Sequence, residues 1–192
     1  ITTVPVTANV TVLITASYQT SNASANLDVL AAGVNSLTIN PSTVPGGVST
    51  TGLVTLTGTA PAGGVTVALS SNNVAAVVNA SVTVLQGNSS ATFPITTLAV
   101  PLSTTATITA TANSLSDTAD LQIIAANLLS ISFNPPRVRG GQTTAMTITL
   151  DAAAPPGVSV VITSSNPSIA TIPSPVTITA GQTQRTVIVT TR

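Results

Sequence analysis

The chain repeats itself with a period of 94 residues from its first residue to its last. Asn40-Pro41 returns as Asn134-Pro135, and Gly46-Gly47 returns as Gly140-Gly141. A period of this size is about one small domain. The chain holds two periods and four further residues, so the repeat predicts a tandem array of domains.

Within one period, apolar residues alternate with Thr or Ser at a spacing of two. This spacing is typical of β-strands that bury one face and expose the other to water. Residues 36–126 predict seven short strands, lettered A to G, and no window has a helical period between helix caps. Their apolar positions, in chain order, are Leu37 and Ile39; Val54 and Leu56; Val65, Val67 and Leu69; Ala76, Val78, Val82 and Val84; Phe93 and Ile95; Ala106, Ile108 and Ala110; Ala119, Leu121 and Ile123. The predicted fold class is all-β: tandem immunoglobulin-like β-sandwiches with about seven strands per 94-residue repeat.

Three local features predict departures from a regular pattern. Pro94 cannot donate a backbone hydrogen bond, which places its strand at a sheet edge or a bulge. Strand C of the second period is one residue out of phase with the first, so we expect a bulge or an adjusted turn near Pro155-Pro156-Gly157. Phe93 and Phe133 are the two large rings that we expect inside the aliphatic core.

The composition excludes most chemistry. The chain has no His, Cys, Trp, Lys or Glu, and only 4% of its residues are charged, against about a quarter in ordinary domains. Acid, base and nucleophile catalysis needs groups that this chain lacks, so we expect no enzyme and no cofactor or metal site. Nucleic-acid binding is excluded because the four basic residues are too few for a basic patch. No apolar run approaches the roughly 20 residues of a membrane span.

A family resemblance follows from the order of the segments LTINPSTVPGG, VTLTGTAPAGGVTVALSS, ATFPITT, TATITATANS and TADLQI. It resembles the bacterial immunoglobulin-like repeats that occur in tandem in long secreted and surface proteins, and it covers essentially the whole chain. The resemblance implies an extracellular or cell-surface location and a role as a stalk, an adhesin rod or a filament subunit. It also implies that other cell-surface or matrix components are possible partners.

The phase of the repeat predicts three parts. Residues 1–32 supply the end of strand E with strands F and G, residues 33–126 form a complete domain, and residues 127–192 supply strands A to E. The two part-domains complement each other, which predicts a homopolymer assembled head to tail by strand complementation between chains. The expected joint residues are Ile1, Val4, Val10, Val12, Ile14, Leu27, Val29, Val189 and Arg192.

Two alternatives to the filament stay open. The rival structural interpretation is that the chain is a window of one long continuous array of such domains. It is also consistent with an adhesin or a carbohydrate-binding surface module, for which Tyr18 is the one exposed aromatic candidate, although sugar sites generally need a broader aromatic platform.

Smaller features have local explanations. Asn-x-Ser/Thr sequons at Asn9, Asn22, Asn79 and Asn88 are possible glycosylation sites, although a chain rich in these residues produces them readily. Asp117 and Asp120 lack the interleaved spacing of a calcium loop and are expected as turn residues before strand G. Arg137 and Arg139 form a small positive patch that either stays solvated or pairs with an Asp of a neighbour.

Overall fold

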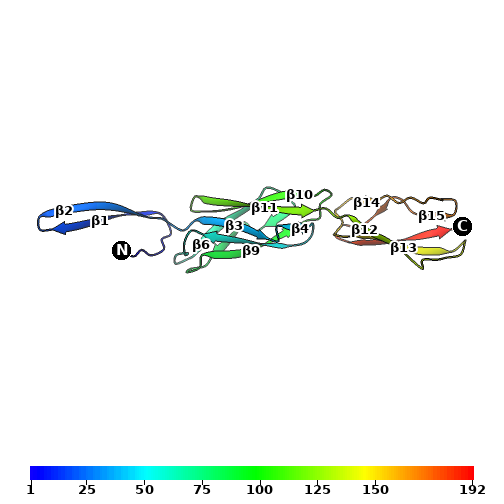
Figure 1. Ribbon diagram of the computed structural model, residues 1–192, viewed down its shortest axis with the longest axis horizontal. Helices are drawn as coiled ribbons and strands as arrows, with labels where there is room; N and C mark the ends of the chain where they lie inside the picture. The colour runs from blue at the N-terminus through cyan, green and yellow to red at the C-terminus, as the bar shows by residue number, and fades with distance from the viewer. The chain divides into compact units, whose positions relative to one another are not determined.

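The computed structural model describes all 192 residues and contains 17 strands and no helix (Figure 1). The all-β prediction is therefore confirmed. No helix long and apolar enough to cross a membrane is found. The chain forms two compact units, residues 1–42 with 50–95 and 107–121, and residues 43–49 with 96–106 and 122–192.

Residues 34–124 fold into two antiparallel-rich sheets with the division typical of immunoglobulin-like sandwiches. One sheet has the order β3 (Val34–Asn40), β5 (Thr50–Leu56), β9 (Ser90–Thr97), β7 (Ala76–Val78). The other has the order β4 (Thr43–Pro45), β11 (Leu115–Ile124), β10 (Thr104–Ala112), β6 (Val65–Ser71), β8 (Ser81–Val84). The strands predicted as A, B and E share the first sheet, and those predicted as C, F and G share the second.

The core of this sandwich consists of the alternate apolar residues that the period of two predicts. Strands β5 and β6 both bury every second residue. The most deeply buried side chains come from both sheets and include Val54, Val67, Val84, Ile95, Ile108 and Leu121. Phe93 is buried as predicted. Burial of such aliphatic side chains, at about 1.5–3 kcal/mol each, supplies the main driving force for the fold.

Three features of the strands differ from expectation. The stretch from Ala76 to Val84 divides into β7 and β8, which join different sheets, and the short strand β4 pairs in parallel with β11. The prediction that Pro94 lies on an edge strand or at a bulge is wrong, because β9 lies between β5 and β7 and its register with β5 is unbroken at Pro94. Strand β7 has only three residues against eight in β9, so it leaves most of that side of β9 without a strand partner, and a proline is tolerated there.

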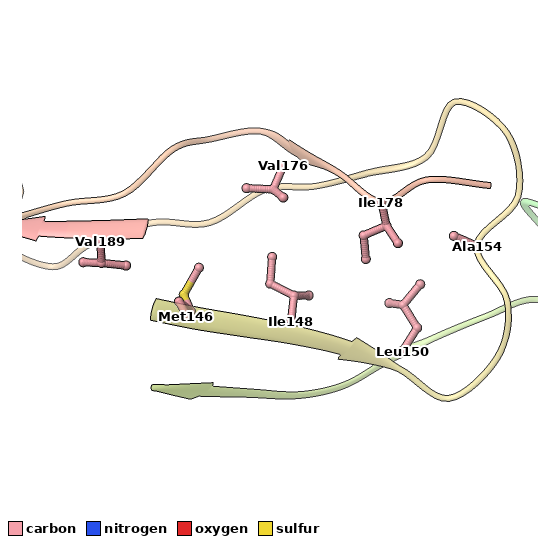
Figure 2. Close-up of a cluster of buried hydrophobic side chains, with 7 residues drawn as sticks. All are labelled: Met146, Ile148, Leu150, Ala154, Val176, Ile178 and Val189. Carbon is pink, nitrogen blue, oxygen red and sulfur yellow. The ribbon is translucent and has the colours of Figure 1, made fainter. Parts of the chain in front are cut away.

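Residues 127–192 build the first of these two sheets again, together with a fragment of the second. The sheet order is β12 (Leu128–Asn134), β13 (Thr143–Leu150), β17 (Gln184–Thr191), β15 (Ala170–Thr171). Strand β14 (Ser159–Val160) pairs only with β16 (Val176–Thr177). Figure 2 shows the core, in which three side chains of β13 face four from other segments: Met146, Ile148 and Leu150 against Ala154, Val176, Ile178 and Val189.

The predicted slip of strand C is confirmed by the pairing register. Val160 pairs with Val176, as Val67 pairs with Val82 in the first repeat. Val82 and Val176 are 94 residues apart in the sequence, whereas Val67 and Val160 are only 93 apart.

The slip originates in the turn before the strand. The first repeat uses two successive glycines at positive φ, Gly63 and Gly64, whereas the second has Gly157 alone. Glycine adopts this conformation without a steric cost. One turn residue is thus missing from the second repeat, and the adjusted turn keeps the apolar side chains facing inward.

Residues 1–32 contain one hairpin, β1 (Val10–Tyr18) and β2 (Ser21–Val29), drawn in blue in Figure 1. The two strands pair along their whole length, from Val10 opposite Val29 to Tyr18 opposite Ser21. They form a sheet of two strands. A lone hairpin of this kind is at best marginally stable in water.

Candidate assembly site: two uncovered apolar faces

The hairpin carries one apolar face that nothing in the chain covers fully. We call the side chains of Val10, Val12, Ile14, Leu27 and Val29 the hairpin face. Val12 lies opposite Leu27, and Val10 lies opposite Val29, so these residues share one side of the two-stranded sheet. An apolar groove runs along this side, and residues 1–4 and Val6 contribute to its lining.

Repeat equivalents show what covers such a face in a complete domain. Ile14 is 38% exposed, whereas its equivalent Ile108 on β10 is fully buried. Leu27 and Val29 are half-buried, whereas their equivalents Leu121 and Ile123 on β11 are fully buried. The hairpin therefore presents to solvent the surface that strands F and G turn towards the core of the complete sandwich.

The part-domain 127–192 has a matching uncovered face on β12. We call Ile131 and Phe133 the β12 face. Ile131 is 51% exposed where its equivalent Leu37 is 4% exposed, and Phe133 is 39% exposed where Ile39 is 8% exposed. The prediction that Phe133 lies inside is wrong, because residues 127–192 contain no strands equivalent to β10 and β11 to cover it.

The segment after β12 keeps the conformation of β4 although no strand pairs with it. Thr191 Oγ1 donates to the carbonyl oxygens of Arg139 (3.2 Å) and Gln142 (2.7 Å). In the complete domain, Thr97 Oγ1 makes the equivalent bonds to Pro45 (3.5 Å) and Val48 (2.8 Å).

Further bonds repeat around the same segment. Gln142 N donates to Arg139 O at 3.1 Å, as Val48 N donates to Pro45 O at 3.1 Å. Residues 137–139 are therefore held in place as an edge that we call the acceptor edge. An edge that no strand pairs with can act as a template for a further strand.

The strand missing from the acceptor edge is the equivalent of β11. In the complete domain, β4 pairs in parallel with the end of β11, with Val44 opposite Ile123. Gly46 N then donates to Ile124 O at 2.9 Å. Val44 is buried by this pairing, whereas its equivalent Val138 is half-exposed.

The remaining predicted joint residues lie outside the hairpin face and the β12 face. Ile1 and Val4 are exposed and lie outside any strand. Val189 lies in the core of residues 127–192, and Arg192 N donates to Ile169 O at 2.9 Å. Residues 1–4 and residues 189–192 occupy the same positions of the repeat. The C-terminal segment belongs to strand β17 as far as Thr191, whereas residues 1–4 form no strand.

The joint residues expected from the sequence include the whole hairpin face, but not Ile131, Phe133 or residues 137–139. The 94-residue offset applied to strand A identifies Ile131 and Phe133 as equivalents of buried residues. The acceptor edge was not recognised because its equivalent β4 is a three-residue strand that includes a proline, too short to show an alternating pattern. The parallel pairing with β11 that reveals it is a tertiary feature.

Comparison with known proteins adds a modest finding. No protein family matches the chain, and no curated protein matches it. Among solved structures, the chain is similar to the D0–D1 domain of Intimin, at 17% identity and a TM-score of 0.40, over 83% of this chain and 85% of that one. It is also similar to domains 4–9 of the surface layer protein SbsC, at 16% identity and a TM-score of 0.36, over 94% of this chain and 30% of that one. The fold assignment rests on the chain's own sheets.

The other candidate residues have ordinary structural surroundings. Asp117 and Asp120 lie within β11 and not in a turn; their carboxylates accept hydrogen bonds from Leu37 N (2.8 Å) and Thr107 Oγ1 (2.7 Å). Tyr18 is exposed at the end of β1. The four sequon residues Asn9, Asn22, Asn79 and Asn88 are exposed, and their glycosylation stays a prediction.

Proposed function

We propose that this chain is a structural protein, a subunit of an extracellular filament or stalk built from immunoglobulin-like domains. Residues 1–32 of one copy complete residues 127–192 of the next. The observation that carries the proposal is a difference in burial between the repeats: Ile14, Leu27 and Val29 on the hairpin face, and Ile131 and Phe133 on the β12 face, are half-buried or exposed, whereas their equivalents in residues 34–124 are buried.

The joint follows the strand order of the complete domain. Strands β1 and β2 occupy the places of β10 and β11, so β1 pairs with β14 and β2 pairs with the acceptor edge. Main-chain hydrogen bonds supply affinity in such strand addition, and alternate side chains supply specificity. Because the donor and acceptor surfaces differ, each copy offers both, and a contact that does not close on itself produces an open fibre.

Apolar burial supplies most of the energy of the joint. A side chain such as Ile14 or Phe133 contributes about 1.5–3 kcal/mol when it passes from full exposure to full burial. These side chains are already partly covered, so each contributes a fraction of that amount. Several together, with the restored backbone pairing, support a stable joint without any charged or catalytic group.

The extracellular location is inferred from the composition together with the resemblance to bacterial immunoglobulin-like repeats. A surface of Thr, Ser and Asn with few charges responds little to pH or salt. Such a surface suits a structural element exposed to changing surroundings.

Single aspartate substitutions on the two sides of the hairpin test the joint. Ile14→Asp places a charge on the hairpin face, which costs several kcal/mol if that face is buried unpaired. Leu13→Asp is the matched control, because Leu13 points to the opposite side and its equivalent Thr107 lies on an outer face. We expect filaments by electron microscopy and sedimentation for the unmodified chain and the control, and only monomers for Ile14→Asp.

A deletion gives an independent readout. A chain that lacks residues 1–32 keeps the acceptor edge and loses the donor hairpin, so it should not polymerise. Filaments of normal yield from this chain or from Ile14→Asp would overturn the proposal.

A further inference from the structure

Charge is scarce in this chain, yet two of its four basic residues lie on the acceptor edge. Arg137 and Arg139 flank Val138 there, and both are exposed. Their equivalents in the complete domain are the neutral residues Thr43 and Pro45. The second repeat therefore carries positive charge at a place where the first repeat needs none.

The register of the complete domain identifies what lies opposite this charge. Thr43 on β4 is the direct partner of Gln122 on β11, and both side chains are exposed. Addition or subtraction of the 94-residue period converts Thr43 into Arg137 and Gln122 into Asp28. A neutral pair within the domain thus corresponds to an oppositely charged pair at the proposed joint.

We infer that Asp28 of one copy and Arg137 of the next form an ion pair across the joint, an inference that rests on the proposed function. Neighbouring strands lie about 4.8 Å apart, and directly opposite residues share a face. Asp28 is exposed on the outer side of β2, where its Oδ1 accepts a hydrogen bond from Thr11 Oγ1. That bond orients the carboxylate and leaves its second oxygen for the guanidinium.

The ion pair distinguishes the joint from the complete domain, which has neutral residues at these positions. The donor hairpin carries Asp28 where β11 carries Gln122, and the acceptor edge carries Arg137 where β4 carries Thr43. The pair therefore favours insertion of the hairpin at the acceptor edge over exchange into residues 34–124. Electrostatic complementarity of this kind contributes more to specificity and association rate than to affinity.

Charge reversal with rescue between two different chains tests the pair. Asp28→Arg and Arg137→Asp each place like charges opposite each other in a polymer of identical chains. In an equimolar mixture, the two variants restore opposite charges at every joint that alternates between them. Arg185→Asp is the control, because Arg185 is an exposed arginine on β17 that lies opposite Ile148 within its own chain.

The critical concentration for filament formation is the measurement. Exposed ion pairs are modest, so we expect each single variant to raise it by about two- to ten-fold at low salt. The mixture should return close to the unmodified value, and about 0.5 M salt should remove the difference because it screens exposed charges. The Arg185→Asp control should match the unmodified chain.

The outcomes separate this inference from the proposed function. If the unmodified chain assembles but the single variants assemble equally well, or if the mixture is not rescued, the ion pair is overturned and the joint remains. If neither the unmodified chain nor any variant assembles, the proposed function itself fails and the ion pair fails with it.

Discussion

At the scale of single residues, the two repeats fill the same place in the core with different pairs of side chains. Gly52 on β5 lies opposite Phe93 on β9, and a Cβ at Gly52 would collide with the Phe93 ring. In the second repeat, Met146 lies opposite Val187 at the same two positions. A small residue with a large partner is thus replaced by a large residue with a smaller partner, which conserves the packed volume.

This comparison predicts a compensated double substitution. Gly52→Ala should lower the free energy of unfolding by about 1–3 kcal/mol through overpacking against Phe93. Gly52→Met combined with Phe93→Val should recover most of the stability, because residues in contact are not additive. Denaturant unfolding followed by circular dichroism measures both. A neutral Gly52→Ala, or a double variant no more stable than the sum of its single effects, would contradict the packing argument.

At the scale of elements, a pair of hydrogen bonds between Asn127 and Asp151, which we call the clip, joins the start of β12 to the end of β13. Asn127 N donates to Asp151 Oδ1 at 2.6 Å, and Asp151 N donates to Asn127 O at 3.0 Å. The backbone bond from Asn127, with its side-chain bond second, lowers the pKa of the Asp151 carboxyl below its usual value. In the first repeat the same clip is neutral: Gly33 N donates to Thr57 Oγ1 at 3.2 Å.

The clip predicts that the stability of the second repeat depends on pH through Asp151. Because the pKa of Asp151 is lowered by folding, its stabilising contribution is fully present above the unfolded value of about 3.9 and is lost as the pH falls through the folded pKa. Asp151→Thr, which copies the residue of the first repeat, should keep a clip and remove this dependence. Thermal unfolding from pH 6 to pH 2 measures the difference between the two chains; identical pH profiles would exclude a role for Asp151.

The strands also differ in how far the sequence predicts them. Strands with several alternating residues, such as β5 and β10, were predicted because one buried face imposes a period of two. Strand β4 was missed because three residues cannot show a period. Phe133 was misplaced because alternation shows which face is apolar, whereas burial depends on whether another element covers it. The hairpin face was predicted from the repeat offset, but the acceptor edge required the parallel register of β4 and β11.

At the scale of the whole molecule, stability is unequal along the chain. Within residues 34–124, central strands such as β5 and β10 have partners on both sides and contribute to a core between two sheets, whereas β1 and β2 have only each other. Backbone amides exchange with solvent through local opening, whose free energy falls where few apolar contacts hold the element. In an unassembled chain, the hairpin should therefore have a low free energy of local opening.

This inequality predicts where assembly changes the protection of backbone amides. Hydrogen exchange of the assembly-blocked Ile14→Asp chain should show little protection in residues 10–29 and in residues 137–139, and strong protection in β5 and β10. In filaments of the unmodified chain, protection should rise by at least about a hundred-fold in the first two segments, because an element gains the stability of the domain that it completes, and should stay unchanged in β5 and β10. The Leu13→Asp filaments provide the matched control. A rise spread evenly over the chain, or one that spares the hairpin, would mean that copies associate through another surface.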